Sequence, residues 1–235
     1  MIKVNKSWIV GFISVVLALC SLFFLPDSVP VHYDLAGNID SWGSKYTNLI
    51  FPALIIVLII VFSLIQYLSN KSSSEAKNMD KTEAYKKTNA RVINIISVVV
   101  SCLFLVIQVC TFINQISIAN NVGSLMISSK SIISVTFASL GLLLIIVGNY
   151  LPKTKMNGVA GVRTKWSMYN DNTWSKSNFI GGAILIIVGV ISIVLSIILN
   201  SIVLVVSVLS LIIVAAAVIT ICSYAIYKEE LRKSN

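Results

Sequence analysis

Two polar stretches interrupt a sequence that is otherwise strongly apolar, and both hold residues that could do chemistry. Residues 26–45 read PDSVPVHYDLAGNIDSWGSK, and residues 157–174 read NGVAGVRTKWSMYNDNTW. The first stretch holds the single histidine of the chain together with three aspartates, and the second holds an arginine between glycines and tryptophans. We therefore expect the functional residues to lie in these two stretches.

The first stretch combines an imidazole with carboxylates, a set that could bind a metal or form a hydrogen-bonded lid. Alternate residues of an extended segment point to opposite faces, so His32 and Asp34 are predicted to share one face, opposite Tyr33. One imidazole without further nitrogen or sulfur ligands is a poor metal site. We expect no metal and no cofactor, and predict a lid over the mouth of a helix bundle. Its candidate binding residues are Pro30, His32, Asp34, Gly37, Asp40, Trp42 and Lys45.

An extended conformation for this segment is indicated by its apolar alternation. A Gly-Asn turn signal follows the alternating residues, which is typical of a chain that folds back on itself. The alternating residues are Val29, Val31, Tyr33 and Leu35.

The second stretch places Arg163 where its planar guanidinium could donate two parallel hydrogen bonds to one acceptor. That acceptor could be Asp171, backbone carbonyls at the end of a helix, or an acidic group on a partner. Trp166 and Trp174 are expected at the level of the lipid headgroups, where tryptophan is enriched. A simple membrane anchor is the alternative interpretation. The candidate binding residues here are Gly161, Arg163, Thr164, Trp166, Asp171 and Trp174.

The elements that position these stretches are predicted to be membrane-spanning helices. Hydrophobic residues make up 57% of the chain and charged residues only 11%. A helix needs about 20 apolar residues to cross a bilayer, and backbone groups in lipid must be satisfied within the segment. The sequence predicts an all-α integral membrane protein whose six helices cover residues 8–25, 49–68, 92–119, 131–151, 179–199 and 202–222.

The distribution of lysine and arginine predicts the orientation of these helices. With both termini in the cytoplasm, 16 of the 18 basic residues fall in inner segments, leaving Lys45 and Lys130 outside. Basic residues in short loops stay on the cytoplasmic side. The stretch between helices one and two is then a short extended outer loop, and residues 157–174 form an inner loop. The net charge of +9 is a topology signal and not a sign of direct nucleic-acid binding.

The predicted spans are free of ionisable acids, bases and histidine, which argues against an ion-coupled pump. They carry amides and glycines, residues that commonly mediate helix packing: Asn94, Gln108, Asn114, Gln115, Asn149, Gly141, Gly148, Gly182 and Gly189. The four cysteines lie within the spans and show no metal-binding spacing. Three parts are predicted: a two-helix unit at 1–68, a cytoplasmic linker at 69–91, and a four-helix unit at 92–235.

Both polar stretches resemble sequences of a known family. The first is similar to a short amino-terminal domain of uncharacterised function, with a Val-Pro-x-His start and a Gly-x-x-Asp-x-x-Gly-x-Lys finish. The second resembles the signature of the SdpI family of bacteriocin immunity proteins. The matching positions are Val29, Pro30, His32, Gly37, Asp40, Gly43 and Lys45 in the first, and Gly161, Arg163, Thr164, Trp166, Trp174 and Gly181 or Gly182 in the second. Lys165 stands where the family usually has proline.

The resemblance implies a non-enzymatic multi-pass protein of the bacterial cell membrane that protects the producing cell against a secreted peptide toxin. It also implies toxin sensing and recruitment of a cytoplasmic transcriptional repressor, with membrane lipids as further partners. Two alternatives stay open from the residues. One is a small exporter of the toxin, and the other is a membrane enzyme or lipid-binding protein that uses Arg163.

Overall fold

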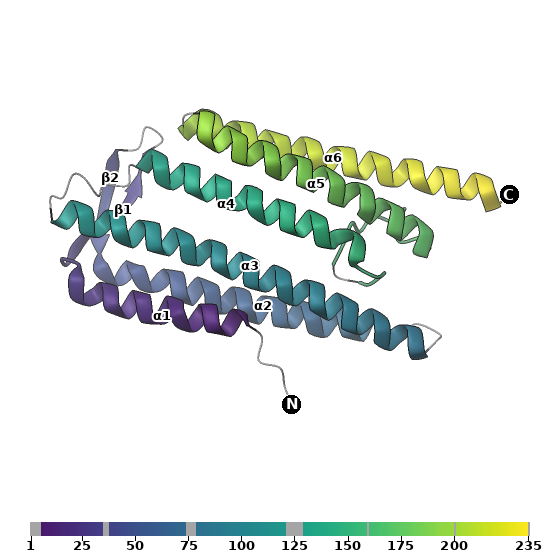
Figure 1. The fold of residues 1–235 in the computed structure, drawn as a ribbon, viewed down its shortest axis with the longest axis horizontal. Helices are drawn as coiled ribbons and strands as arrows, with labels where there is room; N and C mark the ends of the chain where they lie inside the picture. Colours follow the sequence, from purple (N-terminus) through teal and green to yellow (C-terminus); the bar gives the residue numbers. More distant parts are fainter. Residues whose placement is uncertain are drawn as a thin grey trace. The chain divides into compact units, whose positions relative to one another are not determined.

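The structure is a computed structural model, and it describes residues 6–34, 38–73, 79–120, 129–158, 160–199 and 201–234. Leu35 and Gly37 of the first stretch lie outside the described residues. These described residues form six α-helices and a two-stranded antiparallel sheet, which Figure 1 draws as coiled ribbons and arrows. The elements in chain order are α1 (Ser7–Phe24), β1 (Ser28–Tyr33), β2 (Ile39–Ser44), η1 (Lys45–Leu49), α2 (Ile50–Ser73), α3 (Met79–Ala119), α4 (Ser129–Tyr150), η3 (Leu151–Lys153), α5 (Asp171–Ile198) and α6 (Ser201–Ser234).

All six helices are long and apolar enough to cross a membrane, which confirms the predicted all-α membrane fold with six spans. The candidate spans are Ser7–Phe24, Lys45–Ser69, Glu83–Ala119, Ile132–Lys153, Asp171–Ile198 and Ile202–Lys233. Much of their apolar surface is exposed, as expected for side chains that face lipid. By the length and composition of these helices, the chain is a multi-pass membrane protein. The cytoplasmic location of both termini stays a prediction.

Proline sets the end of α1. The helix ends at Phe24, and Leu25 is already extended, with ψ at 143°. Pro26 follows, and its ring disfavours a helical conformation in the residue before it. The chain therefore leaves α1 in the extended conformation from which β1 starts.

The chain divides into two compact units, each built from segments that are distant in the sequence. Unit 1 comprises residues 1–60, 97–140 and 192–208, and unit 2 comprises residues 61–96, 141–191 and 209–235. The hairpin of β1 and β2 belongs to unit 1, and the segment between η3 and α5 belongs to unit 2. The predicted division at 1–68, 69–91 and 92–235 stays a prediction, although α3 begins at Met79 and so gives the predicted linker a helical part.

Unit 1 packs α1 through a stripe of small residues at alternating spacings of four and three. A helix repeats its faces at this spacing, and small residues let helix backbones approach closely in lipid. Gly11 of the stripe faces α2, where an added Cβ would lie 3.1 Å from Ile59 Cδ1. Ser14 Oγ donates to Gln108 Oε1 of α3 at 2.5 Å. The buried stripe is Ser7, Gly11, Ser14, Ala18 and Ser21.

Unit 2 brings α4 and α5 together at glycines. A Cβ added to Gly182 would lie 2.4 Å from the carbonyl oxygen of Gly148, and one added to Gly189 would lie 2.5 Å from that of Gly141. Such distances leave no room for a side chain, so the two backbones meet directly. The packing role predicted for these four glycines is confirmed.

Candidate functional site

The β1–β2 hairpin is an antiparallel pair with an irregular register. Ser28 pairs with Ser44 and Pro30 with Trp42, but the pairing shifts on both sides of His32. The turn is held by Asp34, whose Oδ1 accepts the backbone N–H of Asn38 at 2.8 Å. A carboxylate that accepts nearby backbone amides is a common way to stabilise a tight turn.

Two amides of α3 fix the hairpin within unit 1. Gln115 Nε2 donates to the carbonyl oxygen of Pro30 at 3.1 Å, and its Oε1 accepts from Asn48 Nδ2 at 3.0 Å. Asn114 Nδ2 donates to the hydroxyl of Tyr33 at 2.7 Å. Gln115 is buried, so a lost partner here would leave a polar group unsatisfied. The role predicted for Asn114 and Gln115 was packing between helices, whereas the partners of these hydrogen bonds lie in β1 and η1.

Burial of the Tyr33 ring raises the pKa of its hydroxyl above the ordinary value, because desolvation disfavours the phenolate. The hydrogen bond from Asn114 acts in the opposite direction and is the smaller effect. Tyr33 is thus held neutral as a hydrogen-bond acceptor between the hairpin and α3.

The structure departs from the predicted alternation along β1. Val29 and Pro30 are buried, whereas Val31 is exposed, so Val31 does not share the buried side of Val29. The physical reason is the register shift between Pro30 and His32, which leaves Val31 as an extra residue. A Cβ added to Gly43 would lie 2.9 Å from Val31 Cγ1, so glycine makes room for the displaced valine.

The candidate binding residues of the first stretch form contacts within the hairpin, but His32 and Asp34 each have a different partner and do not act together. His32 Nδ1 lies 2.6 Å from Asp40 Oδ1, while Asp34 serves the turn. Lys45 forms an ion pair with Asp27 at 3.0 Å. Trp42 stands 56% exposed on β2. The hairpin therefore presents an exposed surface that combines an aromatic ring with a His–Asp pair.

The α4–α5 loop, residues 154–170, is fixed by buried amide side chains of unit 2. Asn89 of α3 pairs with the backbone of Lys155 in both directions, accepting its N–H at 2.9 Å and donating to its carbonyl at 3.2 Å. Asn157 accepts the N–H of Ala160 at 2.7 Å and donates to the carbonyls of Lys155 and Ala160. Side chains here replace the backbone ladder that a strand would supply.

Trp174 is buried at 2% exposure, so its predicted place among the lipid headgroups is wrong. Its Nε1–H donates to the carbonyl of Thr154 at 3.0 Å, which gives the buried indole the partner it requires. Gly161 lies against the ring with φ at +129°, and an added Cβ would lie 2.7 Å from Trp174. Asn178 Oδ1 accepts the N–H of Val162 at 2.8 Å and completes this corner.

Thr164 fastens the loop to α6. It caps a single turn reciprocally with Ser167: the N–H of Thr164 donates to Ser167 Oγ at 2.9 Å, and the N–H of Ser167 donates to Thr164 Oγ1 at 3.0 Å. Thr164 Oγ1 also lies 2.6 Å from Ser223 Oγ of α6. Thr164 is therefore an architectural residue of the loop.

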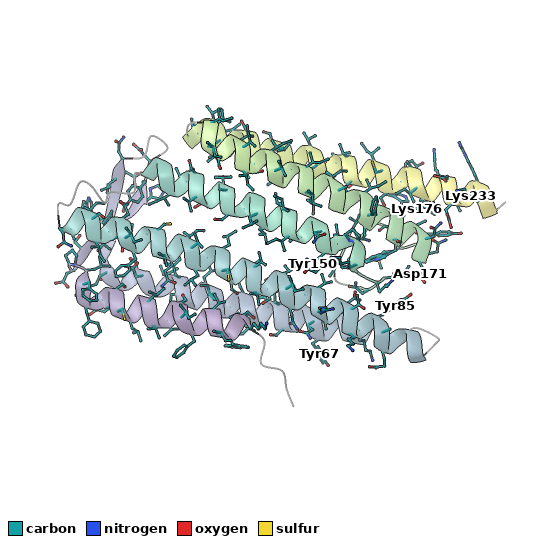
Figure 2. All side chains as sticks on the ribbon, in the orientation of Figure 1. Tyr67, Tyr85, Tyr150, Asp171, Lys176 and Lys233 are labelled. Atoms are coloured by element: carbon teal, nitrogen blue, oxygen red, sulfur yellow. The ribbon has the colours of Figure 1, made fainter. Side chains whose placement is uncertain are left out.

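The start of α5 repeats this reciprocal cap. The N–H of Thr173 donates to Asn170 Oδ1 at 2.8 Å, and the N–H of Asn170 donates to Thr173 Oγ1 at 3.0 Å. Glu230 of α6 accepts from Asn170 and Asn172. Asp171 accepts from the Tyr85 hydroxyl at 3.4 Å, and both residues are labelled in Figure 2. The acidic side chain near the helix N-terminus is also favoured by the helix dipole.

Arg163 is exposed and, among the residues that the structure describes, makes no hydrogen bond or ion pair. Among the described residues, neither Asp171, which accepts from Tyr85, nor a backbone carbonyl bonds to Arg163, and the acidic group on a partner stays a prediction. Trp166 packs against Tyr224 of α6 with ring centroids 5.0 Å apart and ring planes tilted by 56°. The loop thus holds its backbone rigidly and leaves the Arg163 cation open to an external group.

Several residues of this site were not among the sequence candidates. Asn89 and Asn178 escape sequence reasoning because a polar residue in a helix gives no sign of a distant backbone partner. Tyr224 and Lys228 could have been found, since they lie where the apolar run of α6 ends. No group of three metal-ligating side chains occurs within the described residues.

Comparison with known proteins confirms the family resemblance. Residues 153–225 match the SdpI/YfhL protein family, and residues 9–56 match the Domain of unknown function (DUF1648). The chain is 23% identical over 207 residues to "Immunity protein SdpI" of Bacillus subtilis (strain 168), covering 88% of this chain and 86% of that protein. No solved structure matches.

Proposed function

We propose that the chain is a non-enzymatic membrane immunity protein that protects its producer from a secreted peptide toxin. The observation that carries this proposal is the similarity to the B. subtilis immunity protein, which extends over 88% of the chain. The similarity includes both the hairpin and the α4–α5 loop as family segments.

The hairpin is the proposed contact for the toxin. Peptides that act on membranes carry apolar and aromatic residues, and an exposed ring on a fixed scaffold binds such groups with little loss of freedom. Trp42 and Tyr46 are 56% and 60% exposed. Gln115 and Asn114 hold the strand beside them in place. The outer location predicted from the charges would make this surface accessible to a secreted toxin.

Toxin sensing followed by recruitment of a cytoplasmic repressor is the finer part of the proposal. It is supported by the predicted inner location of the α4–α5 loop, which would be accessible from the cytoplasm. A membrane two-hybrid assay between this chain and small regulators encoded beside its gene, with and without toxin, tests it. Absence of toxin-dependent association with any of them would restrict the function to protection.

A survival assay tests the proposed function directly. Sensitive cells that express the chain should tolerate toxin purified from a producing strain, and cells with empty vector should not. Trp42→Ser should lower the tolerated toxin concentration by about tenfold, as expected for loss of one aromatic side chain that the bound toxin would bury. Tyr67→Ser, a matched change of an exposed aromatic residue on α2, should leave tolerance unchanged.

Each outcome bears on a different part of the proposal. Wild-type cells that die at the same toxin concentration as vector cells would overturn the immunity function. Full protection by Trp42→Ser at wild-type abundance would remove the hairpin as the contact. Accumulation of toxin inside energised inverted vesicles would show export, and the binding mechanism would then be wrong.

A further inference from the structure

One face of α6 is apolar and exposed from Val214 to Ile221, and it ends in an aromatic residue and a cation. Val214, Val218 and Ile221 are 58%, 40% and 67% exposed, and their spacing of four and three keeps them on one side of the helix. Tyr224 and the exposed Lys228 continue this side. In a bilayer such a face contacts acyl chains, so its polar end lies at the level of the lipid phosphates.

The α4–α5 loop meets α6 at this end. The Trp166 ring lies 5.0 Å from the Tyr224 ring, and Lys228 Nζ lies 4.9 Å from the centroid of Tyr224. The hydrogen bond between Thr164 and Ser223 fixes the loop one residue away from this contact. Arg163 and Lys165, the neighbours of Thr164, are both exposed. Lys228 thus lies against the Tyr224 ring, and the two loop cations flank in sequence the residue that bonds to Ser223, next to Tyr224.

These cations have no internal counter-ion among the described residues, because the nearby acidic side chains are engaged elsewhere. Asp171 accepts from Tyr85, and Glu230 accepts from two asparagines. Glu229 pairs with Lys233. These tyrosine and asparagine donors are neutral, so Asp171 and Glu230 keep their negative charge. Basic residues still outnumber acidic ones by eight to three in residues 153–176 and 228–233, which gives this region a net positive charge that favours an external anion.

We propose that Arg163, Lys165 and Lys228, together with Trp166 and Tyr224, bind the phosphate headgroup of an anionic phospholipid whose acyl chains lie along α6. The guanidinium fork of Arg163 matches the phosphate oxygens, and the lysines add charge. The tryptophan and tyrosine rings occupy the interfacial layer, as aromatic residues do. A lipid fits better than a soluble anion because the exposed apolar face of α6 continues directly from the cationic cluster.

The loop is well suited to this role because its backbone is already fixed. Trp174, Asn157 and Asn178 satisfy backbone groups that precede Arg163, and Ser167 accepts the N–H of the residue that follows it. Binding of a headgroup then orders only side chains and not the loop itself, which favours affinity. Neither toxin nor repressor enters this inference, and so it stands apart from the proposed function.

Spin-labelled lipids test the proposal with the full chain. The purified protein is placed in phosphatidylcholine vesicles with a trace of spin-labelled phosphatidylglycerol or spin-labelled phosphatidylcholine, and the immobilised fraction is read by electron paramagnetic resonance. We expect a preference of about fivefold or more for the anionic lipid, since each basic residue near the surface adds to the attraction. The double variant Arg163→Gln/Lys165→Gln should lose most of this preference for the anionic lipid.

Matched variants separate this site from general basic charge. Lys87→Gln/Arg91→Gln removes the same charge from exposed positions of α3 and should keep the preference. Arg163→Lys should give an intermediate value, because it keeps the charge and loses the fork. Lys228→Gln removes the cation that α6 contributes to the site and leaves the loop sequence unchanged. This variant tests the site if a loop variant fails to fold.

Three results would overturn the proposal. The first is an equal preference for both labelled lipids in the wild-type protein. The second is an equal loss in the α3 control and the loop variant, which would show only diffuse basic charge. The third is displacement of the labelled lipid by millimolar inorganic phosphate, which would show a site for a free anion.

Discussion

The hairpin and the α4–α5 loop fix their backbones by different means. The hairpin uses a backbone ladder between β1 and β2, so most of its side chains stay exposed. The described part of the α4–α5 loop has no ladder, and buried side chains such as Asn89, Asn178 and Trp174 satisfy its backbone groups. Substitutions in the loop should therefore cost stability, whereas most substitutions in the hairpin should cost contact with a partner.

This difference explains why the same residue types have different structural roles in the two segments. Trp42 is 56% exposed and accessible to a partner, while Trp174 is buried and holds a carbonyl. Gly43 makes room for a neighbouring side chain, while Gly161 supplies a left-handed backbone. The role of a tryptophan or glycine here follows from how its own segment satisfies the backbone.

Gly161→Ala should have the largest effect on stability. Its φ of +129° is unfavourable for any residue with a Cβ, and the new atom would lie 2.7 Å from the Trp174 ring. We expect a loss of about 2 kcal/mol or more in the free energy of unfolding. Thermal unfolding followed by circular dichroism in detergent measures it. The exposed change Lys165→Ala should shift it by about 0.5 kcal/mol or less, and equal melting of the two variants would contradict the strained corner.

Trp174→Phe should have the next largest effect. Phenylalanine keeps an aromatic ring but lacks the pyrrole part of the indole, so the carbonyl of Thr154 loses its donor in a buried site. A loss of about 1 to 2 kcal/mol follows from an unsatisfied buried acceptor. Trp42→Phe, the same change on the hairpin, should leave the unfolding midpoint unchanged. If both variants lose equally, the two segments do not differ as described.

The helical framework was predictable from the sequence because lipid allows few solutions. An apolar run of about 20 residues must form a helix, so the six spans follow directly from composition. The close approach of α4 and α5 at Gly148 and Gly182 was likewise indicated by small residues within the spans.

The partners within the loops were less predictable. The sequence predicts that His32 shares a strand face with Asp34, but His32 pairs with Asp40. The reason is the register shift in β1, which breaks the regular alternation of side chains. The sequence places Trp174 at the lipid headgroups, but its indole N–H donates to the carbonyl of Thr154, twenty positions earlier in the chain. Long-range hydrogen bonds leave no local pattern, so sequence reasoning found the right segments but not the contacts within them.

Tyr33→Phe should have a smaller effect that depends on pH. At about pH 8 the variant loses the acceptor of Asn114, and we expect a loss of about 1 kcal/mol. The pKa of Tyr33 is raised in the folded state, so the unfolded state ionises first. The stability that the neutral hydroxyl contributes is full below about pH 10 and declines as the pH rises through the folded-state pKa.

The difference in unfolding midpoint between wild type and Tyr33→Phe should therefore shrink between about pH 8 and about pH 11. Tyr46→Phe, an exposed change beside the hairpin, controls for the other tyrosines. A difference that grows with pH would show that the folded state favours the phenolate, and the account of Tyr33 as a neutral acceptor would be wrong.

His32→Gln should have the smallest effect on stability. The His32–Asp40 pair is close, at 2.6 Å, but the two side chains are 69% and 43% exposed, so water competes for both. Exposed pairs of this kind contribute between about 0 and 1 kcal/mol, and glutamine can still donate to Asp40. We expect an unfolding midpoint within error of wild type, together with a measurable change in toxin tolerance if the exposed surface of the hairpin is the contact. A loss as large as that of Trp174→Phe would mean that the hairpin, like the loop, depends on side chains to hold its backbone, and the contrast between the two segments would not stand.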